Sequence, residues 1–184
     1  LELTWLVPLS LIGTICGWLY FVSEHASEAL AHAIGERPVV KAMLAGLALA
    51  ICGTVLPYTM FAGETQADVL METYLTIPAG VLIATGLVKA MLTPALINLG
   101  WRGGHFFPVI FSGVSLGYGL AILTGADPVF CVAVCTASTM GAVMRQPVMV
   151  VGLLLMCFPL KGIVCMIIAA VIAAGIPLPK PLRK

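Results

Sequence analysis

A glycine-rich turn is the part of this sequence with the clearest capacity for chemistry. Residues 99–108 (LGWRGGHFFP) place two adjacent glycines and an arginine between two long apolar runs. Glycine lets the backbone approach an ion closely, and a helix opened by Pro108 has unpaired N–H groups and a positive dipole end at its start. The turn therefore predicts an anion site formed by backbone amides, with Arg102 raising the local anion concentration.

Two other interpretations of the turn stay open at this stage. Glycine pairs also occur where membrane helices pack closely, and Arg102 is equally compatible with a plain interfacial arginine. His105 carries a ring that titrates near neutral pH. The simpler hypothesis is that this ring only packs and that the residue contributes its backbone amide.

The composition indicates which environment must hold the turn. Hydrophobic residues make up 61% and charged residues 9% of the 184 residues, and the mean hydropathy is +1.11, which is far from that of a soluble domain. A formal net charge of +1 argues against nucleic-acid binding. The six cysteines form no Cys-x-x-Cys pair, so we predict no metal site and no disulfide framework. The chain is expected to be an integral membrane protein.

The first part of the sequence predicts long helices, since a span takes about 20 apolar residues. We expect helices over 1–34, 39–55 and 78–99, the last with Lys89 near its middle and a proline-induced kink. A lysine at that depth should face protein or water, snorkel, or pair with an acid. The acids of segment 58–77, Glu64, Asp68 and Glu72, share one face of a short interfacial helix or a hydrated loop; a cation path is the less favoured interpretation.

The second part predicts shorter, interrupted helices. The segments 108–124, 128–144, 147–158 and 159–174 each begin with proline, and several are too short to span a bilayer. Broken helices of this kind occur in transporters where they aim helix ends at a substrate. Residues 175–184 are proline-rich and basic, as expected where a chain leaves on the cytoplasmic side. The chain begins without methionine, so we expect a piece of a longer protein.

Three motifs resemble those of the CLC family of chloride channels and chloride/proton antiporters. Residues 104–108 (GHFFP) match the family's G-x-F-x-P signature after a Gly-Gly pair. Residues 140–147 (MGAVMRQP) are similar to its M-x-A-x-x-x-x-R-A-P segment with a shifted gap, and residues 175–178 (GIPL) resemble its G-K-P-L opening of the last intramembrane helix. The resemblance covers essentially the whole chain, residues 1–184, as the family's second, C-terminal inverted repeat, made of 1–57, 58–77 and 78–184.

The resemblance implies an all-α polytopic fold with tilted and broken helices, and transport of chloride or another halide without a cofactor. It implies that His105 and Phe106 offer backbone amides to the anion, with Gly104 and Phe107 beside them. It further implies a homodimer through helices near 147–174. A first repeat, in the same parent chain or a separate piece, would complete each pore.

Departures from the family pattern leave a second function open. The first-repeat motifs G-S-G-x-P and G-R-E-G-P do not occur, and Pro179 stands where the family has its anion-contacting tyrosine. The alternative is therefore a non-transporting structural subunit with a degenerate CLC fold. We do not expect an enzyme, because Ser112, Ser115 and Ser138 have no His or Asp at a helical spacing. The expected location is the plasma (inner) membrane of a bacterium.

Overall fold

The described part of the chain is built from helices alone. The computed structural model describes residues 3–60, 63–158 and 162–179, and no strand occurs among them. In chain order the elements are α1 (Leu3–Ile34), α2 (Pro38–Val55), the 3-10 turn η1 (Pro57–Thr59), α3 (Glu64–Thr73), the 3-10 turn η2 (Tyr74–Thr76), α4 (Ala79–Asn98), α5 (Phe106–Thr124), α6 (Pro128–Met144), α7 (Pro147–Leu154) and α8 (Ile163–Gly175). The predicted all-α class is confirmed.

The lengths of these helices reproduce the predicted contrast between the two parts of the chain. Four helices (α1, α2, α4 and α5) are long and apolar enough to cross a membrane. Helices α6, α7 and α8 have 17, 8 and 13 residues, which is less than the roughly 20 that a span requires. The last part of the described chain is therefore a set of short helices, as the sequence predicted.

Two predicted boundaries were wrong. Helix α5 begins at Phe106, two residues before Pro108, because proline is tolerated throughout a first turn whose N–H groups lack partners in any case. Helix α7 ends at Leu154 instead of residue 158, since Met156 and Cys157 donate hydrogen bonds to carbonyls three residues back and tighten the chain. Helix α8 begins at Ile163, and the predicted start at Pro159 lies outside the described residues.

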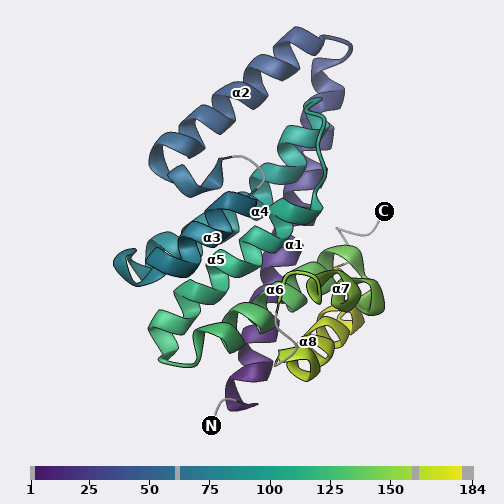
Figure 1. Ribbon diagram of the computed structural model, residues 1–184. Helices are drawn as coiled ribbons and strands as arrows, with labels where there is room; N and C mark the ends of the chain where they lie inside the picture. Colours follow the sequence, from purple (N-terminus) through teal and green to yellow (C-terminus); the bar gives the residue numbers. More distant parts are fainter. Residues whose placement is uncertain (1–2, 61–62, 159–161, 180–184) are drawn as a thin grey trace.

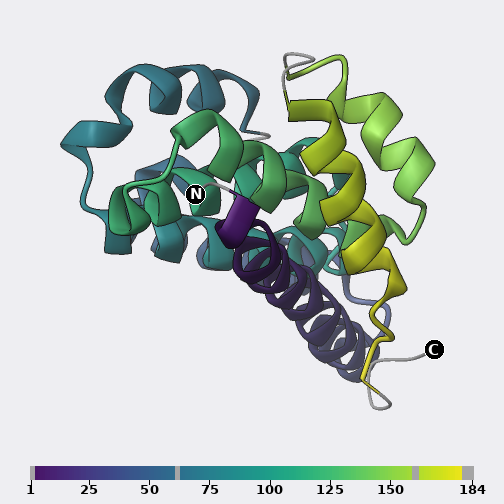
Figure 2. The same cartoon turned by 90° about the horizontal axis from the view of Figure 1, so that it is seen from below.

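Helices α5 and α6 form the centre of the molecule. Every residue from Val109 to Ala121 in α5 and from Cys131 to Ala142 in α6 is buried. Helices α1, α4 and α8 pack around this pair (Figure 1). Helix α2 stands apart at the upper left of that view with only Ala45 buried, and Figure 2 shows α1 extending diagonally from the other helices.

The central pair approaches closely because of its small residues. A Cβ added at Gly113 would overlap the backbone of Thr136, and one at Gly117 would overlap Val132. In a membrane, where burial of apolar surface adds little between helices, such close backbone packing is the main source of helix association. Helix α5 is therefore held rigidly along most of its length, and its N-terminus is held with it.

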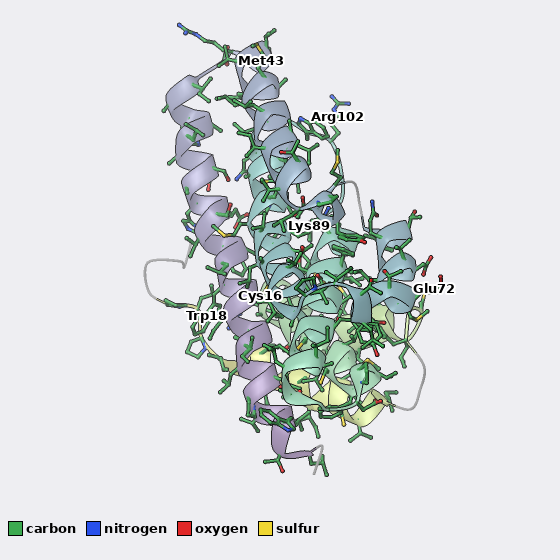
Figure 3. All side chains as sticks on the ribbon, turned by 90° about the vertical axis from the view of Figure 1, so that its left-hand side faces the viewer. Cys16, Trp18, Met43, Glu72, Lys89 and Arg102 are labelled. Atoms are coloured by element: carbon green, nitrogen blue, oxygen red, sulfur yellow. The ribbon has the colours of Figure 1, made fainter. Side chains whose placement is uncertain are left out.

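The acidic segment forms the predicted short helix, α3, at the side of the bundle. Asp68 and Glu72 are exposed, and Figure 3 shows Glu72 at the outer edge of the molecule. These two carboxylates form a solvated face and do not line an internal path. The side chain of Glu64 lies outside the described residues.

Candidate anion site

The turn is positioned first by the way α4 ends. Gly100, with a φ of 98°, donates a hydrogen bond to Ile97 O at 3.0 Å, and Trp101 donates to Leu96 O at 3.0 Å. This pair of bonds is a Schellman motif, which satisfies the last carbonyls of a helix and favours glycine at the left-handed position. It reverses the chain and directs residues 101–104 toward the start of α5.

The start of α5 presents free backbone donors. His105 occupies the N-cap position, and Val109 N–H donates to His105 O at 3.1 Å as the first bond of the helix. The N–H groups of His105, Phe106 and Phe107 have no acceptor among the described residues. Since the helix dipole is positive at this end, these groups are suited to hold an anion.

The two glycines of the turn are not explained by packing. A Cβ added at Gly103 or Gly104 would meet no atom within 4 Å, and neither residue has a positive φ. The fold therefore requires glycine at neither position for its own stability. Without side chains at these positions the backbone beside the amides of α5 is accessible, and no other helix of the described residues packs against either glycine.

The open space beside the glycines is a cavity of about 290 Å³. It lies between α4, the end of η1, one residue of α2 and the turn, and its lining includes Lys89, Arg102, Gly103, Gly104 and Pro108. None of the described lining residues is acidic. Figure 3 shows Lys89 deep between the helices and Arg102 toward the edge of the bundle. The lining of the cavity therefore includes one basic residue deep in the bundle and one near its edge.

The structure settles how Lys89 is placed. Its side chain is 3% exposed, so it does not snorkel to the surface. Its Nζ donates to the backbone carbonyl of Thr59 at 2.6 Å and lies 5.8 Å from the centre of the Phe111 ring. A carbonyl and an aromatic face both stabilise a cation. The prediction that the lysine faces protein is confirmed. Pro94, further along the same helix, lies inside α4 without interrupting it.

The rings of the signature residues point to different environments. The His105 ring stacks on the Phe106 ring, with 4.6 Å between centroids, and lies 6.4 Å from the Tyr20 ring of α1. Phe107 is 48% exposed. The ring of His105 is packed against other aromatic rings, so the hypothesis that this residue contributes its backbone N–H is favoured.

The segment before Pro179 is hydrogen-bonded to the residue that follows α6. Arg145 has a left-handed φ of 55°, and its guanidinium donates to Ala174 O at 3.1 Å and Ile176 O at 3.3 Å. Pro179 follows this anchored segment, is half-buried, and is not part of the cavity lining. No hydroxyl is available at that position.

Sequence analysis missed the wall of the cavity. Lys89, Leu92, Thr93, Leu96 and Ile97 all line it, and their spacing of 3, 1, 3 and 1 residues places them on one face of α4. That periodicity was a usable signal, because it links the lysine to the turn along a single helix face. Thr59 of η1 also lines the cavity, but no spacing pattern in the sequence indicates this residue.

Comparison with known proteins shows the family of the chain. A family model described as Voltage gated chloride channel matches residues 1–177. Because the match covers nearly the whole chain, the protein belongs to the voltage gated chloride channel family. Neither a curated protein nor a solved structure matches the chain. Members of this family are channels or transporters.

Proposed function

We propose that this chain binds chloride or another halide at the start of α5 and contributes that site to an anion pathway across the membrane. One observation carries the proposal. Unpaired amides at the start of α5 adjoin two glycines that packing does not require, beside a cavity lined by Lys89 and Arg102.

The mechanism is coordination by the protein in place of water. The N–H groups of His105 and Phe106 replace part of the hydration shell of the halide, and Gly104 keeps the approach free of side-chain atoms. Lys89 and Arg102 attract the ion without needing to contact it, since charges act over longer distances in a low dielectric. Several weak donors hold an ion without trapping it, as conduction requires.

The site needs a second half to enclose the ion. We infer that residues 1–184 are a C-terminal repeat, and that a first repeat in the parent chain or a separate piece supplies the remaining contacts. The division into 1–57, 58–77 and 78–184 stays a prediction, as does the bacterial plasma membrane. With Pro179 at the tyrosine position, the inner side of the pathway has no hydroxyl and is wider than in relatives that keep it.

We also propose a homodimer through α7 and α8. Val148 and Met156, in and after α7, are 87% and 90% exposed, and Val164 and Val171 of α8 are 63% and 52% exposed. Apolar side chains on short helices need lipid or a protein partner, and helices that do not span a bilayer are better covered by protein. The resemblance to the family favours a second copy.

The competing function is a structural subunit that has lost transport, and the observation that favours it is Pro179. Halide release from liposomes containing the full-length parent protein separates the two. We expect release well above that of empty liposomes, and a loss of at least about tenfold in Gly104→Val because a β-branched residue blocks the amides. Gly80→Val is the matched control, since a Cβ at Gly80 also meets nothing within 4 Å. Release equal to that of empty liposomes would support the structural subunit.

A further inference from the structure

Three helix ends meet around a second cavity, which shares no lining residue with the first. Its volume is about 260 Å³. The lining comes from the last turns of α1, the first turn of α2 and the last residue of α4, and consists of Glu28, Ala31, His32, Lys41 and Asn98. Figure 1 shows these three ends together at the upper end of the bundle. The cavity therefore brings a carboxylate and an ammonium to the same space.

The cavity lies where the apolar parts of these helices end. The apolar run of α1 ends at Val22, and at 1.5 Å per residue Glu28 lies about 9 Å further along the helix. Lys41 and Asn98 lie in the first turn and at the last residue of two other helices that are long enough to cross a membrane. The headgroup layer of a bilayer is about 5–8 Å deep on each side of the hydrocarbon core. We therefore expect this cavity at the level of the lipid headgroups.

The polar atoms of the lining divide into acceptors and donors. Nδ2 of Asn98 donates to Glu24 O at 3.0 Å and to Ser27 Oγ at 2.9 Å. These two bonds use both amide hydrogens, so the atom that Asn98 can offer a ligand is its carbonyl oxygen. The carboxylate of Glu28 is a second acceptor, and the ammonium of Lys41 is a donor. The lining thus provides partners for a cationic and for an anionic group.

The helix dipoles follow the same division. Helices α1 and α4 reach the cavity with their C-terminal ends, which carry partial negative charge, and α2 reaches it with its positive N-terminal end. The acceptors Glu28 and Asn98 belong to the negative ends, and Lys41 belongs to the positive end. His32, in the last turn of α1, adds a ring N–H donor. A zwitterion with its anionic group toward α2 and its cationic group toward α1 and α4 matches both sets of charges.

We propose that this cavity binds the headgroup of an aminophospholipid, such as phosphatidylethanolamine. The phosphate lies against Lys41 and the start of α2, and the primary ammonium donates to the Glu28 carboxylate and the Asn98 carbonyl. The acyl chains lie along α2, because Leu44 and Leu47, three and six residues beyond Lys41, are 37% and 58% exposed. This site does not depend on the proposed anion transport.

The same contacts discriminate among lipid headgroups. The quaternary ammonium of a choline headgroup has no N–H to donate to Glu28 or Asn98. An anionic headgroup without an ammonium, such as that of phosphatidylglycerol, places a negative charge next to Glu28 with nothing to offset it. The volume of about 260 Å³ holds a headgroup but not the two acyl chains, which is why the chains must lie outside the cavity.

The experiment measures lipid affinity by native mass spectrometry. Full-length parent protein, delipidated in detergent, is titrated with the dioleoyl forms of phosphatidylethanolamine, phosphatidylcholine and phosphatidylglycerol. We expect the first to bind at least about fivefold more tightly than the other two. Lys41→Gln should weaken phosphatidylethanolamine binding by about fivefold. Glu28→Gln should weaken it by about threefold and strengthen phosphatidylglycerol binding, so that the preference disappears.

Two matched variants and a soluble headgroup control this experiment. Glu36→Gln and Arg37→Gln remove the same charges from the loop between α1 and α2, outside the cavity lining, and should leave the preference unchanged. Glycerophosphoethanolamine has the headgroup without the chains and should not displace the lipid at equal concentration. Equal affinity of the parent for all three lipids would overturn the proposal, as would a preference that survives in both Lys41→Gln and Glu28→Gln. Displacement by the soluble headgroup at equal concentration would overturn the assignment to a lipid.

Discussion

The glycines of α5 differ from the glycines of the preceding turn in the space that surrounds them. At Gly113 and Gly117 an added Cβ would overlap the backbone of α6, so glycine is needed for two helices to touch. At Gly103 and Gly104 an added Cβ would meet nothing within 4 Å. The first pair is explained by the packing of α5 against α6, and the second pair is not explained by packing within the described residues.

This difference separates stability from function along one short stretch of sequence. The packed part of α5 fixes the helix, and under the proposed function the turn before it presents backbone amides to an ion. A substitution in the first region should therefore act on folding, and one in the second should act on binding. Each prediction below tests that separation at a chosen residue.

The largest effect is expected at the packed glycines. Gly113→Val places a branched side chain against the Thr136 backbone, which cannot move without displacing α6. Overpacking of a core costs about 1–3 kcal/mol and more where backbone is in the way, so we expect a strongly lowered midpoint of thermal unfolding in detergent, or no folded protein. Gly80→Val is the control and should unfold like the parent. A parent-like midpoint for Gly113→Val would show that the α5–α6 packing is looser than described.

A smaller effect is expected on assembly at the open apolar faces. Val148 is 87% exposed and Leu154, six residues further along the same helix, is 0% exposed. Val148→Trp should shift the detergent-solubilised dimer toward monomer without changing unfolding, whereas Leu154→Trp should destabilise each subunit because it overfills the core. Light scattering coupled to size exclusion measures the mass. An unchanged mass for Val148→Trp and a second variant, Val164→Trp, would mean that these faces meet lipid.

The smallest effect is expected at the ring of His105. Because this ring packs on Phe106 near Tyr20, only its backbone N–H belongs to the proposed site. Halide affinities of the parent and of His105→Gln should therefore follow parallel curves between about pH 5 and 8, the range in which histidine changes charge. A parent affinity that strengthens toward low pH, with no such change in the variant, would assign the ring a direct role.

Much of the fold could be predicted from the sequence because membrane helices are set by local patterns. Apolar runs and prolines gave α1, α2 and α4 nearly to the residue, and Gly100 marked the end of α4. The start of α5 was less accurate, because proline within a first turn does not fix the first residue of a helix. The end of α7 was less accurate because the chain tightens after Leu154. The proposed amide site rests on residues 104–108, which are contiguous in sequence, and it stays a prediction.

The cavity could not be predicted with the same ease, because it depends on contacts between separate elements. Lys89 reaches the carbonyl of Thr59, thirty positions earlier in the chain, and the ring of Phe111 from α5. Nothing in the sequence near Lys89 indicates either partner. The choice between snorkelling and burial depended on these contacts, so only the assembled helices could decide it.

The central claim is that backbone amides beside Gly104 bind the halide, and its most direct test is bromide binding measured by calorimetry. The parent protein and its Gly80→Val control should bind bromide with the same affinity. Gly104→Val should lose measurable binding while keeping the parent's unfolding midpoint, since its Cβ has room in the fold. Unchanged bromide affinity in Gly104→Val would contradict the account, because the open glycine would then have no part in holding the ion.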